Sequence, residues 1–324
     1  MAEILPLEKA FERTLQLLDA GEVVAIPTET VYGLAADATN GEAVAGIFEA
    51  KRRPRFNPLI AHVSGLEMAA RHAGFDPLSQ QLAEHFWPGP LTLVLPLRPD
   101  SSVHPLATAG LDTLALRCPR GFAAEIVARL GRPLAAPSAN SSGRVSPTTA
   151  AHVEADLGDR IRLIVDGGAA PVGLESTIVK VEGDELRLLR PGGVDASEIE
   201  AIARRPLTRG NGGGVEAPGM LASHYAPRAG LRLNADEVRA GEALLAFGPA
   251  RAKGADRAVA TLNLSPAGDL REAAARLFAA LQELDSSGAA AIAVEPVPAD
   301  GLGEAINDRL ARAAAPRDNP LGGT

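Results

Sequence analysis

Residues 23–33, VVAIPTETVYG, join a short apolar segment to a polar one, and the fold prediction starts from this change. The first four residues predict a buried strand that the proline ends, and the last six predict a hydroxyl-rich loop. A helix is predicted over Leu7–Ala20, where apolar residues recur near a 3.6-residue period. Another is predicted over Gly41–Lys51, with Asn40 as its N-cap. Helices on both sides of a strand indicate an α/β protein.

The same mixture of strands and helices continues to about residue 205. Two strand-like segments flank Gly183-Asp184, which is typical of a hairpin, so we expect antiparallel pairs in the sheet. The first domain is therefore predicted to hold an open α/β or α+β sheet in which strands of both directions are mixed. Its further strands are predicted at Leu59–Val63, Leu91–Leu97, Thr113–Cys118, Leu134–Ala136, Ile161–Val165, Ser176–Val181 and Glu185–Leu189, and its further helices at 66–72, 77–86, 122–130 and 149–157.

Glycine and proline dominate the segment 206–227, which has no periodicity and predicts a linker. Strand and helix patterns alternate again after it, which predicts a smaller three-layer, Rossmann-like α/β domain. The predicted domains are 1–205, the linker 206–227 and 228–324. The strands of the last domain are predicted at Leu244–Phe247, Ala258–Leu262 and Ala290–Val294, and its helices at Ala267–Leu284 and Gly303–Ala314.

Composition excludes several classes of protein. The 324 residues carry a net charge of −8, which argues against a protein built mainly to coat nucleic acid or an anionic membrane. Aromatic residues amount to 3%, too few for a surface that stacks several bases, so stable nucleic-acid binding is not expected. A single cysteine, Cys118, excludes an internal disulfide and a multi-cysteine zinc site.

No apolar run approaches the roughly 20 residues of a membrane span. The N-terminal residues MAEILPLEKAFERT carry charges where a signal peptide would be apolar. We therefore expect a cytoplasmic protein without a membrane partner.

The densest charge cluster is residues 51–55, KRRPR, at the end of a predicted helix. Its alternative interpretation is a solvated last turn that complements the helix dipole. Only four of the 32 basic residues are lysines, so Lys51 departs from the chain's preference for arginine. A compact ammonium suits a phosphate oxygen, and the cluster leads into Asn57-Pro58 rather than into an open loop. These two details favour anion binding.

A second group is the loop of residues 136–149, APSANSSGRVSPTT, between a predicted strand and a predicted helix. Its hydroxyls, its amide and the following helix N-terminus could donate hydrogen bonds to a phosphate or a ribose, although a capped surface loop would look similar. Single polar residues stand beside other strand ends, and together they suit one polyanionic substrate and one small hydroxylated substrate. These residues are Thr30, His62, Arg117, Ser176 and Arg190.

Common nucleotide and hydrolase motifs are absent from the sequence. There is no G-x-x-x-x-G-K-[ST] loop, no dinucleotide fingerprint, no G-x-S-x-G elbow and no H-E-x-x-H. The residues alone therefore indicate an α/β enzyme that binds a nucleotide or phosphate without a P-loop.

Five motifs in order resemble the threonylcarbamoyl-adenylate synthase family, whose core is the YrdC-like domain. They are residues 27–34 (PTETVYGL), Lys51-x-Arg53-Pro54, Asn57-Pro58-Leu59, residues 87–92 (WPGPLT) and Ser138-Ala139-Asn140. Residues 218–220 (PGM), 224–227 (HYAP) and 301–309 (GLGEAINDR) resemble the longer, two-domain form of the family. The resemblance covers essentially the whole chain.

The resemblance implies a nucleotidyltransferase that makes L-threonylcarbamoyl-adenylate from L-threonine, bicarbonate and ATP, with release of pyrophosphate. Mg²⁺ is expected with ATP, without a dedicated protein ligand. The product would pass to a tRNA threonylcarbamoyltransferase that modifies tRNA.

The resemblance also implies residue roles. Lys51 and Arg53 would be catalytic and would bind ATP phosphates. Threonine would be bound by Thr30, His62, Arg117, Ala136 and Ser176, with Thr28 as an alternative to Thr30. The remaining ATP-binding residues would be Asn57, Thr113, Ser138, Asn140, Ser146, Arg190 and, from the linker, His224.

Two alternatives remain open at this point. One is a non-catalytic RNA-binding protein that uses the same cations. The other is a carbamoyltransferase of hydrogenase maturation, in which a YrdC-like domain accompanies zinc-finger cysteines and an acylphosphatase module. The single cysteine and the chain length count against the second, and the low aromatic content counts against the first.

Overall fold

The structure is a computed structural model that describes residues 1–183, 185–210, 214–220 and 222–316. The chain divides into two compact units. The first consists of Met1–Ser142 and Ser146–Met220, and the second of Gly143–Val145 and Leu221–Thr324. Parts of three predictions lie outside the described residues: Asp184 of the hairpin turn, 211–213 and Leu221 of the linker, and 317–324 of the last domain.

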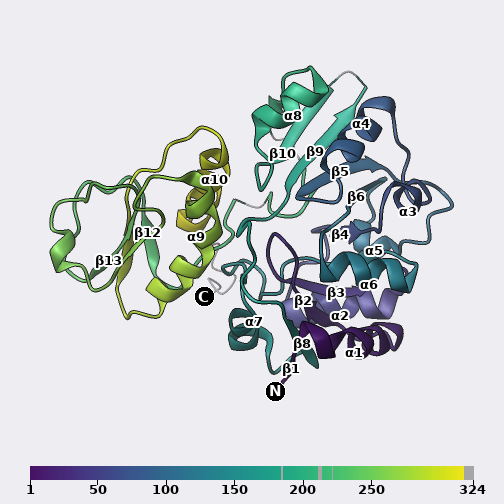
Figure 1. Cartoon of the computed structure of the whole chain (residues 1–324), viewed down its shortest axis with the longest axis horizontal. Helices are drawn as coiled ribbons and strands as arrows, with labels where there is room; N and C mark the ends of the chain where they lie inside the picture. Colours follow the sequence, from purple (N-terminus) through teal and green to yellow (C-terminus); the bar gives the residue numbers. More distant parts are fainter. Residues whose placement is uncertain (184, 211–213, 221, 317–324) are drawn as a thin grey trace, which may run out of the picture. The chain divides into compact units, whose positions relative to one another are not determined.

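The first unit is built on one mixed sheet (Figure 1). Its strands are β1 (Glu3–Pro6), β2 (Val24–Ile26), β3 (Gly33–Asp37), β4 (Ile60–His62), β5 (Leu91–Pro96), β6 (Thr113–Arg117), β7 (Leu134–Ala135), β8 (Leu163–Asp166), β9 (Thr177–Glu182), β10 (Glu185–Arg190) and β11 (Thr208–Arg209). Within the described residues the order is β1-β8-β2-β3-β7-β4-β6-β5-β9-β10-β11. Parallel pairs such as β4–β6 stand beside antiparallel pairs such as β5–β6 and β9–β10. The predicted mixed open sheet is confirmed.

The helices of this unit follow the capping signals of the sequence. They are α1 (Leu7–Asp19), α2 (Gly41–Lys51), α3 (Leu66–Ala70), α4 (Pro77–Phe86), α5 (Pro105–Thr108), α6 (Phe122–Leu130), α7 (Ala150–Leu157) and α8 (Ala196–Ala203). Asn40 caps α2 as predicted, because its side chain accepts hydrogen bonds from two backbone N–H groups of the first turn. The apolar face of α1 packs on α6, with the rings of Phe11 and Phe122 edge to face at 6.0 Å.

The sheet has two different faces. Leu114 and Leu116 of β6 belong to the main apolar core together with residues of α1, α2, α4 and α6. Ala115 belongs instead to a smaller cluster with Ile60, Val94, Ile178, Leu189, Ala217 and Met220. Because successive strand residues point to opposite sides, this smaller cluster marks the second face. Segment 214–220 of the predicted linker therefore packs on that face, and Thr208–Arg209 extends the sheet as β11.

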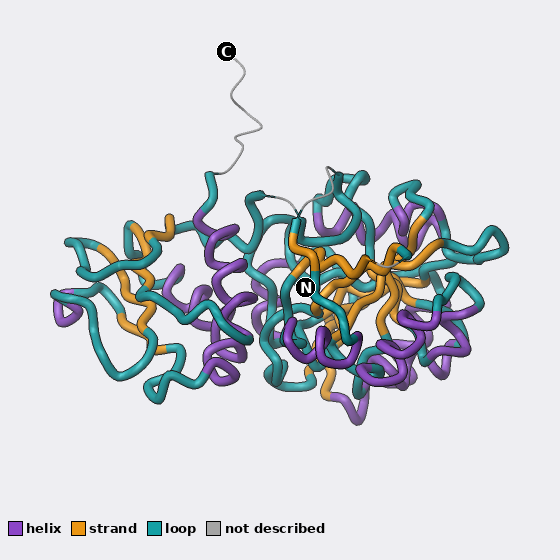
Figure 2. Tube along the Cα trace, turned by 90° about the horizontal axis from the view of Figure 1, so that it is seen from above, coloured by secondary structure: helices purple, strands orange, loops and turns teal. Residues whose placement is uncertain are grey.

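The second unit has a parallel sheet of β12 (Gly230–Arg232), β13 (Glu242–Ala246), β14 (Thr261–Asn263) and β15 (Ala291–Val294) in the order β12-β15-β13-β14. Helices α9 (Leu270–Asp285) and α10 (Leu302–Ala314) lie together on one side of these strands, as Figure 2 shows. Loops and a short 3-10 helix, Ala255–Arg257, cover the other side through a small apolar cluster. A smaller α/β domain is thus confirmed, and its third layer consists of loops and one 3-10 turn in place of helices. Among the described residues, no helix is long and apolar enough to cross a membrane.

Two boundaries in this unit correct the sequence prediction. The strand predicted over Ala258–Leu262 runs over Thr261–Asn263, because the chain first forms the 3-10 helix and Ala258 ends it. The helix predicted from Ala267 starts at Leu270, because Gly268 has a φ of +76° and Asp269 caps the helix.

Several elements of the first unit were not predicted at all. Strand β3 (GLAAD) is buried along its whole length, so it shows no alternation of polar and apolar residues. Strand β1 and helix α5, of four residues each, are too short for a periodic pattern to stand out, and helix α8 was also not predicted.

Candidate active site

Two predicted site residues project from the second face of the sheet. His62 and Arg117 are paired in register at the carboxyl ends of the parallel strands β4 and β6. Two residues earlier, Ile60 and Ala115 belong to the apolar cluster of that face. Alternate residues of a strand share a face, so the histidine and the arginine lie beside this cluster.

Arg117 is buried and donates hydrogen bonds through all three side-chain nitrogens. They reach Thr30 Oγ1 at 2.9 Å, Glu29 Oε1 at 2.6 Å and the carbonyl of Gly89 at 3.3 Å. The ion pair of Arg117 and Glu29 is only 5% and 9% exposed, and the second Glu29 oxygen accepts from the Arg120 N–H. The guanidinium is therefore fixed beside a hydroxyl, an arrangement suited to a small carboxylate ligand.

His62 is buried next to this arginine. Burial, with the nearby charge of Arg117 as a second cause, holds the pKa of His62 well below its ordinary value of 6.5. The ring is thus neutral at pH 7, and its Nδ1 has no hydrogen-bond partner among the described residues. A buried nitrogen without a partner is uncommon in proteins and points to a ligand at this position.

A third polar group lies at the start of β9. The hydroxyls of Thr92 and Ser176 are 2.7 Å apart, and both residues are buried. Arg190 donates to the Ser176 carbonyl at 2.8 Å and to its hydroxyl at 3.2 Å. Its other terminal nitrogen donates to the carbonyl of Pro218 at 3.2 Å, so Arg190 also holds segment 214–220.

Lys51 ends α2 and is 1% exposed. Its ammonium donates to two backbone carbonyls of the predicted anion-binding loop, those of Ser138 and Asn140, both at 2.5 Å. Burial, followed by the charge of Arg53, holds the pKa of Lys51 well below its ordinary value of 10.5. The lysine is therefore not part of a solvated last turn, the alternative interpretation of this cluster.

The segment after Lys51 is shaped by Arg53. Its guanidinium donates to the carbonyls of Asn57 at 3.2 Å and Pro58 at 2.9 Å. The Asn57 side chain is fully buried, and neither atom of its amide has a hydrogen-bond partner among the described residues. An unpaired buried amide costs roughly 1–3 kcal/mol, so a polar ligand is expected to contact Asn57.

The loop at 28–33 joins these groups through its backbone. The Tyr32 carbonyl accepts from the Ala139 N–H at 2.8 Å, within the loop that receives the Lys51 ammonium. The Thr30 carbonyl accepts from the Gly173 N–H at 3.1 Å, in the segment that leads to β9. The groups around Arg117 and Lys51 are thus held by one common loop.

Three further predicted site residues are Thr113, Ala136 and His224. Thr113 lies at the start of β6, on the same face as Arg117 but four residues away, about 13 Å along the strand. Ala136 uses its N–H in a 3.1 Å bond to the Ile60 carbonyl. His224 belongs to the second unit, where its N–H donates to the Arg312 carbonyl and its ring lies 4.1 Å from that of Tyr225.

Sequence reasoning missed three polar residues of the site. Glu29 lies inside a motif that was quoted for the resemblance, but only the structure shows that it pairs with Arg117. Glu175 is buried and accepts a 2.5 Å hydrogen bond from the Ser146 hydroxyl, and Thr92 pairs with Ser176. A carboxylate between two threonines, as in residues 28–30, was the available signal for Glu29.

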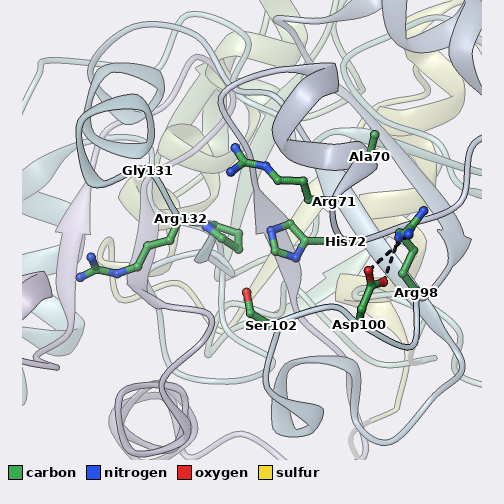
Figure 3. Close-up of a pocket in the computed structure, with 9 residues that line it drawn as sticks. Ala70, Arg71, His72, Arg98, Asp100, Ser102, Gly131 and Arg132 are labelled. Carbon is green, nitrogen blue, oxygen red and sulfur yellow. Dashed lines mark hydrogen bonds and ion pairs between the residues drawn. The ribbon is translucent and has the colours of Figure 1, made fainter.

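A separate pocket of about 480 Å³ in the first unit contains none of the predicted site residues (Figure 3). Arg98 there pairs with Asp100 at 3.0 Å, and Arg132 pairs with Asp37 at 2.6 Å. The guanidinium groups of Arg98 and Arg132 point away from each other in Figure 3, so they do not converge on one ligand. The lining residues are Ala70, Arg71, His72, Arg98, Asp100, Ser102, Gly131, Arg132 and Pro133.

Within the described residues, no three His, Cys, Asp or Glu side chains lie together in a group that could hold a metal ion. The site instead presents a buried ammonium, buried guanidinium groups, a neutral histidine and several hydroxyls on an open mixed sheet. This combination is typical of an α/β enzyme that binds anionic substrates without a P-loop.

The comparisons with known proteins identify the family. A family model for Sua5, YciO and YrdC proteins, described as "Telomere recombination", matches residues 16–192. A second, described as "Threonylcarbamoyl-AMP synthase, C-terminal domain", matches residues 194–315. The chain therefore belongs to the two-domain branch of the threonylcarbamoyl-AMP synthase family.

Individual relatives agree with this assignment. The threonylcarbamoyl-AMP synthase of Bacillus subtilis is 40% identical over 319 residues, which cover 93% of this chain and 92% of the relative. The enzyme of Pyrococcus abyssi is 41% identical over 318 residues, with 92% of each covered. The crystal structure of P. abyssi Sua5 complexed with L-threonine superposes with a TM-score of 0.87, at 35% identity, over 97% of this chain and 98% of that one.

The family assignment decides between the alternatives raised by the sequence. The chain is an enzyme of the nucleotidyltransferase class that acts in tRNA modification, and not a non-catalytic RNA-binding protein. The crystal structure of full-length HypF in the phosphate- and nucleotide-bound form has a similar fold with a TM-score of 0.52, but it is 18% identical, and 29% of its length is covered. That likeness shows a shared fold alone.

Proposed function

We propose that this chain joins L-threonine, bicarbonate and ATP into L-threonylcarbamoyl-adenylate and releases pyrophosphate. The observation that carries the proposal is the pair of neighbouring polar groups, one around Arg117 and one around Lys51, on a fold that matches a threonine-bound relative. The reaction brings together three anions, the triphosphate, bicarbonate and the threonine carboxylate. The buried cations of these two groups suit this need in a chain of net charge −8.

We assign threonine to the group around Arg117. The guanidinium would receive the carboxylate, and the hydroxyls of Thr30 and Ser176 would orient the amino acid. Neutral His62 would contact it through the nitrogen that has no partner among the described residues. Ala136 would contribute through its backbone. Thr28, whose hydroxyl is 2.8 Å from that of Thr30, is the alternative to Thr30 in this role.

We assign ATP to the group around Lys51. Lys51 and Arg53 would neutralise the phosphates and the charge that develops during transfer. Asn57, whose buried amide has no partner in the described structure, would gain one from the nucleotide. The other nucleotide-side residues of this proposal are Thr113, Ser138, Asn140, Ser146, Arg190 and, on the resemblance alone, His224.

The chemistry needs positioning rather than a protein nucleophile. Bicarbonate takes up a proton and loses water to give carbon dioxide. The neutral threonine amine attacks the carbon of this carbon dioxide, and loss of the amine proton, which balances the proton taken up, gives a carbamate. A carbamate oxygen then attacks the α-phosphorus of ATP, and the bond to the β-phosphate oxygen breaks, so that pyrophosphate leaves. Fixed cations on both sides of the reacting atoms lower the barrier by orientation and by charge stabilisation.

We further propose how this site is completed. Mg²⁺ would enter on the triphosphate, because the described residues provide no cage of ligands for it. Residues 1–205 would form the catalytic domain, 206–227 a linker that covers the site, and 228–324 an accessory domain. The burial of Ala217 and Met220 on the second face of the sheet supports a role for the linker. The product would pass, in the cytoplasm, to a tRNA threonylcarbamoyltransferase.

Pyrophosphate release by the purified protein tests the proposal. Release is expected with ATP, threonine and bicarbonate together, and it should fall to background when any one of them is omitted. Serine in place of threonine serves as the matched control for the amino acid. Pyrophosphate release that ignores threonine would overturn the proposed function.

A further inference from the structure

The end of helix α2 and the loop at 138–142 are bound to each other by hydrogen bonds in both directions. The Lys51 ammonium donates to the carbonyls of Ser138 and Asn140. The Lys51 carbonyl in turn accepts from the Ser142 N–H at 2.8 Å. The placement of the ammonium therefore depends on how closely the helix end and the loop are held.

Asp156 of helix α7 holds this loop from the other side. One of its carboxylate oxygens accepts from the Ser141 N–H at 2.7 Å, and the other accepts from the Ser141 hydroxyl at 2.5 Å. Both bonds are charge-assisted, and together they fix the residue that follows Asn140.

Arg160 connects that carboxylate to the helix end. Its guanidinium lies 2.9 Å from the Asp156 carboxylate and donates to the Ser141 hydroxyl at 2.7 Å. Through its other terminal nitrogen it donates to the carbonyl of Ala50, the residue before Lys51. The planar guanidinium thus bridges the loop and a helix carbonyl that lies beyond the last intrahelical bonds.

We propose that Asp156 and Arg160 are positioning residues, which hold the end of α2 against the loop at 138–142 and so aim the Lys51 ammonium at its substrate. This inference rests on the proposed function, because it needs Lys51 to act on ATP. Asp156 and Arg160 are about a quarter exposed, and their described contacts are with each other, the helix end and the loop. Their opposite charges cancel, so the pair fixes the positions of the helix end and the loop without adding net charge to the site. A displacement of about 1 Å at a reacting group costs about 100-fold in rate, which gives such a pair a measurable effect.

Two variants test the pair, Arg160→Ala and Asp156→Asn. Each is expected to lower kcat for pyrophosphate release about 10–100-fold and to weaken ATP binding in calorimetry, while the KM for threonine stays within about twofold. Added guanidinium ion, at millimolar concentration, should restore part of kcat to Arg160→Ala, because it can occupy the space of the missing side chain. Sodium chloride at equal ionic strength should not.

The matched control is Arg162→Ala, two residues further along. Arg162 is 67% exposed and pairs with Glu22 at 3.0 Å, away from Lys51, so this variant should keep the parent kcat. Melting temperatures of all variants show whether a loss of activity comes from displaced residues in a folded protein or from loss of folded protein. Near-parent kcat and ATP affinity in both test variants would overturn the inference. A loss of activity that parallels the loss of folded protein, and that guanidinium ion does not restore, would overturn it as well. A parent protein without threonine-dependent release would instead overturn the proposed function, and the ATP affinities would still test the pair.

Discussion

Two groups of arginine and histidine side chains in the first unit differ in burial and in pairing. In the site, the Arg117–Glu29 pair is 5% and 9% exposed, and the buried His62 ring keeps one nitrogen without a partner in the described structure. In the pocket of Figure 3, the Arg98–Asp100 pair is 47% and 69% exposed, and His72 Nδ1 lies 3.2 Å from the Ser101 hydroxyl. What distinguishes the site is buried charge fixed in place beside polar atoms that a ligand would complete.

The largest effect is expected at Lys51, whose described hydrogen bonds are to two backbone carbonyls. Lys51→Ala should lower kcat by about 1,000-fold, because a buried ammonium opposite developing phosphate charge stabilises the transition state directly. The fold should survive, since the substitution lies at a helix end. The control, Arg71→Ala in the pocket of Figure 3, should leave kcat unchanged. Pyrophosphate release and a melting curve for both variants check this, and near-parent activity of Lys51→Ala would remove the basis for assigning ATP to this group.

A second contrast concerns stability. Glu29→Gln removes the carboxylate beside Arg117 and leaves a buried guanidinium without its counter-charge. We expect a loss of about 3–5 kcal/mol in the free energy of unfolding, measured by urea denaturation. The KM for threonine should also rise, because Arg117 is no longer held in one position, while the KM for ATP stays near the parent value. A stable variant with an unchanged threonine KM would show that Glu29 does not position Arg117.

The sequence predicted the fold well where its patterns are strong. Helices α1 and α2, the β9–β10 hairpin and three of the four strands of the second unit were expected from periodicity, caps and turn residues, whereas strand β12 was not predicted. Strand β3 escaped prediction because it is buried on both sides, and a boundary at β14 moved because a 3-10 helix precedes it. Local patterns do not record such tertiary effects.

Some residues of the site could likewise be predicted from the sequence, and others could not. Lys51 could be singled out from composition alone, because lysine is rare in this chain and stands in an arginine cluster. The partners that hold the site could not, since Glu29, Asp156 and Arg160 contact residues 88, 15 and 110 positions away. Contacts between residues so far apart in the chain arise only when the sheet and its loops are assembled.

A third effect is expected in the pH dependence of the free energy of unfolding, which should differ between the parent protein and His62→Gln. Folded His62 stays neutral well below pH 6.5, whereas the unfolded chain protonates near 6.5. As the pH falls below 6.5, the unfolded state therefore binds more protons, and the free energy of unfolding declines by up to about 1.4 kcal/mol per pH unit. In His62→Gln this share of the decline should vanish. His72 and His152, whose pKa values are also lowered by burial, remain in both proteins as an internal background. Urea denaturation at pH 7.5, 6.5 and 5.5 measures the difference, and parallel pH curves for parent and variant would contradict a neutral buried His62.

The smallest effect is expected from Arg98→Met. The Arg98–Asp100 pair is exposed to water, so solvent screens its attraction, and its loss should change neither the melting temperature nor any KM measurably. A null result of this kind is informative because Arg98 and Arg117 are both arginines with a carboxylate partner, and they differ in burial. If Arg98→Met raised the KM for ATP or threonine instead, the pocket of Figure 3 would belong to the catalytic machinery. Burial and unpaired polar atoms would then no longer suffice to separate the site from the rest of the surface.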